Sequence, residues 1–185
     1  MVNIFINIAI LIFVLQSFWF LVSILIKRND VADFAWGLGF IFIAIYLLLS
    51  EIPTPSLKLI SVLVSIWGVR LATHILLRLL KKPEDYRYQL WRQEWGKRFY
   101  LRSYLQVYLL QGFFMYLISI PIIVSTTIDS FTLSPVQFIG LSVWLLGFYF
   151  ESQADKELKD FVTNPENRGQ VMQSGLWRYS RHPNY

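Results

Sequence analysis

The chain has 185 residues, of which 55% are hydrophobic and only 16% are charged, and its formal net charge is +5. A soluble domain usually carries about 25% charged residues, so this composition argues against an ordinary soluble domain and favours a membrane protein. The sequence contains no cysteine, which excludes disulfides, a thiolate nucleophile and cysteine-based metal sites.

Five apolar stretches are long enough to cross a membrane as helices, for which about 20 residues are needed. The first starts just after Met1, without a basic region or a small-residue cleavage site, so we interpret it as an uncleaved span. The sequence therefore predicts an all-α, polytopic transmembrane helix bundle that forms one integral membrane domain over residues 1–185. The predicted spans are 4–26, 31–49, 57–80, 104–125 and 135–150, followed by a cytoplasmic segment over 151–185.

Lysine and arginine residues predict the orientation of this bundle, because short loops rich in them stay in the cytoplasm. The second loop carries only Lys58 and the fourth carries none. We therefore expect the N-terminus to lie outside and the third loop and the tail to lie in the cytoplasm. This pattern accounts for the basic charge without a nucleic-acid partner. The basic residues on the cytoplasmic side are Lys27, Arg28, Lys81, Lys82, Arg87, Arg92, Lys97, Arg98, Arg102, Lys156, Lys159, Arg168, Arg178 and Arg181.

The third predicted span contains Arg70, His74 and Arg78, which are spaced four residues apart and therefore share one helical face. Charge within the hydrocarbon is costly and usually faces the interior of the bundle or a cavity. Two alternatives are a neutral, hydrogen-bonded core role for His74 and an interfacial position for the long side chain of Arg78. Asp33, at the start of the second span, is a candidate partner for this face; the alternative is a charge favoured by the helix macrodipole.

Two further pairs of polar residues interrupt the apolar pattern. Gln106 and Gln111 lie in the fourth span, where we predict that their amides form hydrogen bonds between helices. Glu151 and Asp155 follow the fifth span four residues apart, so they share a face and could cap the inner surface or receive a cation.

The closing stretch GLWRYSRHPNY gathers polar and aromatic side chains whose types suit a nucleotide cofactor. The planar guanidinium group of arginine is suited to binding phosphate, so we predict that Arg168, Arg178 and Arg181 have this role. The amide of Asn184 both donates and accepts, as pairing with a carboxamide such as that of nicotinamide requires. Pro183 directs the residue before it away from helical geometry, so a turn is expected there. The alternative is a basic belt at the membrane surface with interfacial aromatic residues.

The motifs together resemble the DUF1295 membrane proteins, relatives of the steroid 5-alpha-reductase and sterol reductase group. The resemblance is carried in chain order by DFAWG at 33–37, WGVRL at 67–71, DYRY at 85–88, WG at 95–96, ESQADKELKDF at 151–161 and the closing stretch. It implies a bundle of six or seven spans whose cytoplasmic half holds NADPH above a lipid-facing substrate pocket. Asn184 and Asp155 match cofactor-site positions of the family.

The sequence departs from the pattern of these families at its C-terminus and in the second and third spans. In the family the closing motif continues into Phe-Gly-Glu, so we expect that the chain is cut inside the site and that residues 1–185 bind NADPH at least about tenfold more weakly than a longer chain. Steroid reductases use a glutamine–glutamate pair in the second span and a tyrosine in the third, where this sequence has Asp33 and an arginine–histidine face. A similar R-H-P-x-Y stretch also occurs in isoprenylcysteine carboxyl methyltransferases, which bind S-adenosylmethionine.

We therefore predict an NADPH-dependent oxidoreductase that reduces a carbon–carbon double bond in a steroid-like or other lipid substrate, with no metal and no known protein partner. The alternatives are an S-adenosylmethionine-dependent membrane methyltransferase and a non-enzymatic membrane protein whose tail binds anionic lipids. The predicted catalytic residues are Asp33, Arg70 and His74. The predicted cofactor-binding residues are Asp155, Arg168, Trp177, Arg178, Tyr179, Ser180, Arg181, His182, Asn184 and Tyr185.

Overall fold

The computed structural model describes residues 2–128 and 135–184, and every regular element within them is helical. The protein is an all-α polytopic membrane helix bundle, as the sequence predicts. Its chain divides into two compact units, Met1–Phe131 and Thr132–Tyr185, and each is described by itself.

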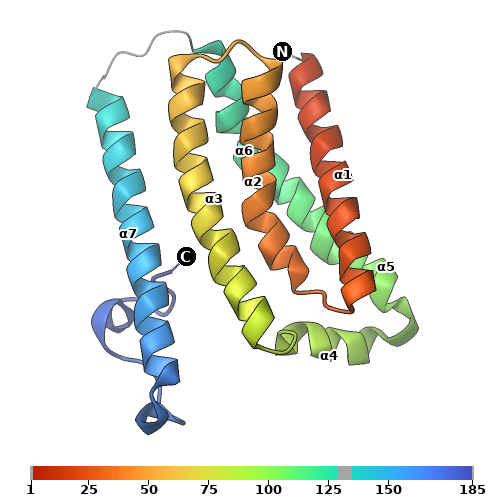
Figure 1. Cartoon of the computed structure of the whole chain (residues 1–185), viewed down its shortest axis with the longest axis vertical. Helices are drawn as coiled ribbons and strands as arrows, with labels where there is room; N and C mark the ends of the chain where they lie inside the picture. Colours follow the sequence, from red (N-terminus) through yellow and green to blue (C-terminus); the bar gives the residue numbers. More distant parts are fainter. Residues whose placement is uncertain (1, 129–134, 185) are drawn as a thin grey trace. The chain divides into compact units, whose positions relative to one another are not determined.

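The first unit is built from four long helical stretches that run along one another. Figure 1 shows α1, α2 and α3 with α6 packed against them, while α4 crosses one end of the bundle. At the opposite end, the Thr54 hydroxyl caps α3 by accepting from the Leu57 backbone N–H and donates to the Ser125 carbonyl at 2.9 Å. The elements are α1 (Val2–Ile26), α2 (Val31–Ser50), α3 (Pro55–Lys81), α4 (Tyr86–Trp95), η1 (Gly96–Arg98), α5 (Phe99–Ser103), η2 (Tyr104–Leu109), α6 (Leu110–Val124) and η3 (Ser125–Thr127).

Helices α2 and α3 pack closely against each other, and two glycines permit this approach. A Cβ atom added to Gly37 would lie 2.9 Å from the carbonyl oxygen of Gly68, and one added to Gly68 would lie 2.8 Å from that of Gly37. Small residues at such contacts let transmembrane helices approach closely. Beside the contact, the rings of Phe40 and Trp67 meet edge to face at 5.6 Å.

Apolar side chains cover both the interior and the outside of this unit. A buried cluster that includes Ile8, Phe40, Ile43, Leu47 and Met115 fills the centre between α1, α2 and α6. Large apolar side chains also remain exposed along α1, α3 and α6, which suits contact with lipid and not with water. Four stretches are long and apolar enough to cross a membrane, and they are Asn3–Ile26, Val31–Ser50, Pro55–Lys81 and Tyr86–Thr127.

The second unit consists of one long helix and the segment that follows it. Helix α7 runs from Pro135 to Thr163, and two short turns, η4 (Pro165–Asn167) and η5 (Gly175–Arg178), come after it. The fifth predicted span forms the first part of α7, but α7 is not among the four stretches that meet the length and apolarity needed for a span. The helix also continues past Phe150, so the predicted cytoplasmic segment begins inside a helix.

The hydrogen bonds expected between helices from Gln106 and Gln111 do not form among the residues that the structure describes. Gln106 is exposed on η2, and the amide oxygen of Gln111 is buried without a hydrogen-bond partner among the residues that the structure describes. In addition, Tyr104–Leu109 is π-helical where the sequence predicts a regular helix.

Candidate functional site

Two regions hold most of the polar side chains, and the first is the end of the bundle at which α4 crosses. There the α1–α2 loop is anchored by Arg28. Its guanidinium donates two hydrogen bonds to the carboxylate of Asp30, at 3.1 and 2.8 Å. It also donates to the carbonyl oxygens of Leu79 and Lys82, at the end of α3. The Arg28 side chain therefore provides hydrogen bonds to carbonyl oxygens that the end of a helix otherwise leaves unpaired. The hydrogen bond to Asp30 also raises the pKa of the Arg28 guanidinium.

The α3–α4 loop completes this network from the other side. The Glu84 carboxylate accepts a hydrogen bond from the Asn29 backbone N–H at 2.7 Å and forms an ion pair with Arg92 at 3.0 Å. The backbone N–H of Asp85 donates to Asp30 at 3.1 Å. Asp30 is almost fully buried, so its negative charge is balanced by donors from two loops that are far apart in the sequence.

Asp33 belongs to the same network and pairs with the helix face predicted for it. Its Oδ2 lies 2.7 Å from Nη2 of Arg78 and 3.9 Å from Nη2 of Arg87, and its Oδ1 accepts from the Tyr88 hydroxyl at 3.1 Å. The predicted pairing of Asp33 with the Arg70–His74–Arg78 face is therefore formed through Arg78. Asp33 also lies in the first turn of α2, as the macrodipole alternative requires.

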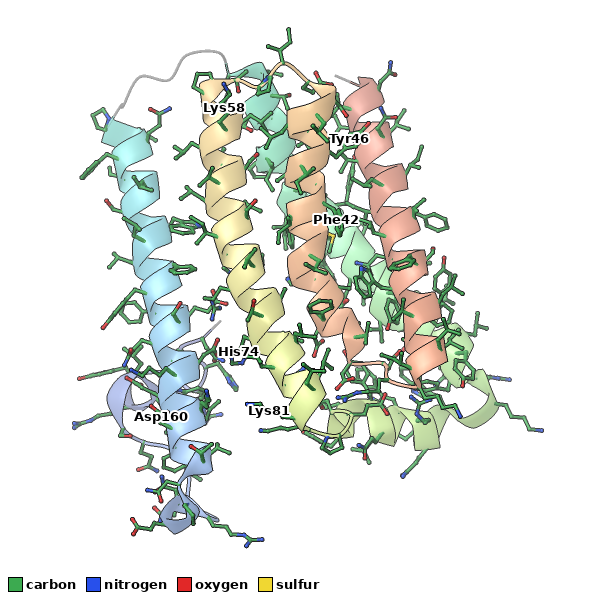
Figure 2. All side chains as sticks on the ribbon, viewed as in Figure 1. Phe42, Tyr46, Lys58, His74, Lys81 and Asp160 are labelled. Atoms are coloured by element: carbon green, nitrogen blue, oxygen red, sulfur yellow. The ribbon has the colours of Figure 1, made fainter. Side chains whose placement is uncertain are left out.

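The other two predicted catalytic residues, Arg70 and His74, precede Arg78 on α3 and lie further from its C-terminal end. Arg70 is half-buried and His74 is exposed, and both share a helical face with Arg78 because α3 is unbroken from Pro55 to Lys81. Figure 2 shows His74 about two turns before Lys81, which ends the helix. The catalytic role of Asp33, Arg70 and His74 stays a prediction.

At the edge of this network, Asp85 caps α4. Its carboxylate accepts from the backbone N–H of Arg87 at 3.0 Å and pairs with the Arg87 guanidinium at 3.1 Å. The hydrogen bond from the Arg87 side chain is the largest of the effects that lower the pKa of the Asp85 carboxyl. Functional roles for Asp30, Glu84 and Tyr88 were not predicted from the sequence. The available signal was the presence of charges of both signs in RND at 28–30 and PEDYR at 83–87, two loops predicted to lie on the same side.

The second polar region is the C-terminal segment of the second unit, which folds back onto α7. The Glu157 carboxylate accepts a hydrogen bond from the Leu176 backbone N–H at 2.9 Å, and the Trp177 indole N–H donates to the Ala154 carbonyl at 3.1 Å. Gly175, with a φ of +58°, lets the chain approach so closely that a Cβ atom there would collide with the Glu157 carboxylate. Glu157 was not predicted as a site residue, although it lies in the ESQADKELKDF motif.

These contacts bring the predicted cofactor residues Asp155 and Asn184 together. The Asn184 side chain donates through Nδ2 to the Asp155 carboxylate at 3.0 Å, which fixes the orientation of the amide. Its Oδ1 atom is buried and accepts no hydrogen bond from any residue that the structure describes. The segment therefore presents an oriented amide with one unused acceptor, and an unused buried acceptor favours a bound donor.

The other predicted cofactor residues lie in the same C-terminal segment as this amide. Arg168, Arg178 and Arg181 are exposed, and within residues 2–128 and 135–184 none of the three forms an ion pair. The rings of Trp177 and His182 lie edge to face at 6.4 Å. Ser180 accepts from the His182 backbone N–H at 3.2 Å, Tyr179 is exposed, and Tyr185 lies outside the described residues.

No curated protein and no solved structure matches the chain. The chain belongs to the family described as "Protein of unknown function (DUF1295)", whose model matches residues 19–185.

Proposed function

We propose that the protein is a membrane NADPH-dependent reductase of a carbon–carbon double bond in a lipid-like substrate. The observation that carries this proposal is the Asn184 amide, which is held by Asp155 and has one buried oxygen without a partner among the described residues. The carboxamide of nicotinamide has an NH₂ group that matches this acceptor. The residues present therefore fit the nicotinamide end of the cofactor.

The charges of the segment fit the other end of the same molecule. NADPH carries a pyrophosphate and a 2′-phosphate, and unpaired guanidinium groups are the preferred protein donors to phosphate. In this proposal Arg168, Arg178 and Arg181 bind phosphate, and Trp177 offers an aromatic surface. Because the Trp177 indole N–H is already held by the Ala154 carbonyl, that surface is fixed before a ligand arrives.

The proposed reaction adds one hydride and one proton across the double bond. When bound, NADPH supplies the hydride and leaves as NADP⁺, while Asp33, Arg70 and His74 are the residues proposed to polarise the substrate or deliver the proton. The proposed orientation has the N-terminus outside and the C-terminal segment in the cytoplasm, where NADPH is available. The distribution of lysine and arginine supports it.

The experiment that tests the cofactor is a titration of the purified chain in detergent with NADPH, followed by NADPH fluorescence. Losing the hydrogen bond from the carboxamide should weaken binding by about tenfold in Asn184→Ala, which is about 1.4 kcal/mol. Gln173→Ala is the matched control, because Gln173 is an exposed amide in the same segment. Its affinity should equal that of the unchanged chain.

Two outcomes contradict the proposal. Binding of S-adenosylmethionine without binding of NADPH would favour the methyltransferase alternative. If the segment only binds anionic lipid headgroups, its binding free energy depends on its positive charge and amounts to about 1 kcal/mol for each basic residue near the surface. Equal NADPH affinity in Asn184→Ala and the unchanged chain, together with binding of anionic vesicles, would therefore identify the segment as a lipid-binding tail.

A further inference from the structure

An unusual group of buried polar atoms lies within the membrane-spanning part of the first unit. Gln16 is only 1% exposed, yet its amide oxygen has no hydrogen-bond partner among the described residues. The indole N–H of Trp19, one turn later on α1, and the amide oxygen of Gln111 on α6 are also buried without partners in the described part of the chain. All three belong to predicted membrane spans.

Such atoms are costly at this depth. Gln16 lies near the middle of α1, where no bulk water is present to satisfy the amide. A buried polar group without a hydrogen bond costs about 1–3 kcal/mol, and an apolar residue of similar size avoids that cost. Gln16 therefore lowers stability unless a further molecule supplies its hydrogen bond.

The facing helix is distorted at the same level. Residues Tyr104–Leu109 are π-helical. This geometry is rare in proteins overall, but where it occurs it is frequently found at functional sites. The Tyr104 hydroxyl and Ser17 Oγ lie 2.9 Å apart, in hydrogen-bond contact between the two helices. The Ser17 residue that makes this bond directly follows Gln16 on α1, and Gly112, which lies against Gln16, comes three residues after the π-helical segment ends.

An apolar groove of about 600 Å³ lies on the same two helices, lined by Phe5, Ile6, Ala9, Ile10, Phe13 and Tyr116. Gln16 is three residues after Phe13 and seven after Ala9, a spacing that places all three on one face of α1. On the other helix Tyr116 is one turn after Gly112, and a Cβ atom added to Gly112 would lie 3.1 Å from Cγ of Gln16. The groove therefore ends about one helical turn from Gln16 on α1 and about one helical turn from Gly112, the neighbour of Gln16, on α6.

We propose that the interface of α1 with η2 and α6 binds an elongated apolar molecule that carries one hydroxyl group. The hydrocarbon lies in the groove, and the hydroxyl bonds to the amide of Gln16, which can both donate and accept. The depth of the site decides the class of ligand. Only a molecule that is mostly hydrocarbon reaches the middle of a bilayer, so the site excludes ions and polar metabolites. This inference concerns a ligand site and does not rest on NADPH binding.

The test uses two photoreactive probes, hexadecanol and hexadecane, each carrying the same diazirine, with the full chain in nanodiscs. Hexadecanol should label peptides of α1 and α6 at lower concentration than hexadecane. Gln16→Leu should weaken hexadecanol labelling at least about fivefold and leave hexadecane labelling unchanged. Gln106→Leu is the matched control, since Gln106 is a glutamine of the same interface region whose side chain is exposed. Ala9→Trp, which fills the groove, should reduce labelling by both probes.

Thermal unfolding of the unliganded variants gives a second readout. Because Gln16→Leu removes an unsatisfied polar group, the variant should melt at the same temperature as the unchanged chain or above it. A lower melting temperature would mean that the Gln16 amide has a structural partner within the protein and would overturn the proposal. So would equal labelling by the two probes, which would leave ordered water as the partner of the amide. Labelling of other helices alone would exclude this groove.

Discussion

The end of the bundle and the C-terminal segment are both rich in arginine, but they use it in opposite ways. At the end of the bundle, Arg28, Arg78 and Arg92 each contact a carboxylate of the same unit at 2.7–3.0 Å. In the C-terminal segment, Arg168, Arg178 and Arg181 are exposed and form no ion pair within the described residues. Charges whose partners are built into the chain hold helices together, whereas unpaired charges remain available to a ligand. The comparison predicts that mutations in the first region change stability and that mutations in the second change binding.

The largest effect is expected for Asp30→Ala. This substitution removes the buried acceptor of Arg28 and of the Asp85 backbone N–H, and breaking a buried pair costs about 3 kcal/mol. The free energy of unfolding, measured by SDS titration in mixed micelles, should fall by about that amount. Asp30→Asn, which keeps the shape but not the charge, should cost less. Unchanged stability in both variants would show that the network does not hold the two loops.

Replacing Arg178 and Arg181 by alanine together tests the other half of the comparison. We expect NADPH affinity to fall by at least about tenfold, which is about 1.4 kcal/mol, while the free energy of unfolding changes by less than about 0.5 kcal/mol, as is usual at exposed positions. The control is Lys156→Ala with Lys159→Ala, which removes the same charge from exposed positions of the same unit. If both double variants lose affinity equally, the arginines act only through net charge.

Arg78→Ala should have a smaller effect on stability than Asp30→Ala. The ion pair of Arg78 with Asp33 is short, but the two side chains are 32% and 21% exposed, so water screens it. Loss of about 1 kcal/mol is expected, and Arg78→Lys should restore part of it. A loss as large as that of Asp30→Ala would mean that the whole network behaves as one buried unit.

The smallest effect concerns pH. Because the pKa of Asp85 is lowered in the folded protein from its ordinary value of 3.8, its stabilisation is complete above that value and is lost as the pH falls through the lowered pKa. The free energies of unfolding of Asp85→Asn and the unchanged chain should therefore differ by less than about 1 kcal/mol at pH 6, and the difference should shrink as the pH falls below 3.8. A difference that does not shrink below that pH would assign the effect to the helix cap and not to the charge.

The sequence predicts the parts of the fold that depend on local pattern. Continuous apolar runs such as the first span fix helix type and approximate bounds, and a spacing of four residues places Arg70, His74 and Arg78 on one face. In contrast, the π-helical turn at Tyr104 depends on packing, and no local residue signals it. The continuation of α7 past Phe150 was missed although residues 151–163 contain neither glycine nor proline, because the predicted bounds followed apolarity and not helix propensity. The Asn29–Glu84 bond joins residues 55 apart in sequence, so only the folded chain identifies that pair.

The same limit applies to the candidate site. Residue types alone predict that Asn184 and the three arginines suit a cofactor, but they do not predict which amide atom is free. That follows from the Asp155 contact and from the close approach at Gly175. The role of Gln16 was likewise not predicted, because one glutamine in an apolar run has no distinct pattern until its neighbours are known.

The contact of Arg28 with the end of α3 has a consequence for how the chain is inserted into the membrane. The contact requires the α1–α2 loop and the α3–α4 loop to emerge on the same side of the bilayer. If the first hairpin were inserted with the reverse polarity, Arg28 and Glu84 would be separated by the whole hydrocarbon layer, and the carbonyls of Leu79 and Lys82 would lose their donor. These bonds therefore form only when the first hairpin and α3 are inserted with matching polarity, whichever side of the bilayer the two loops face.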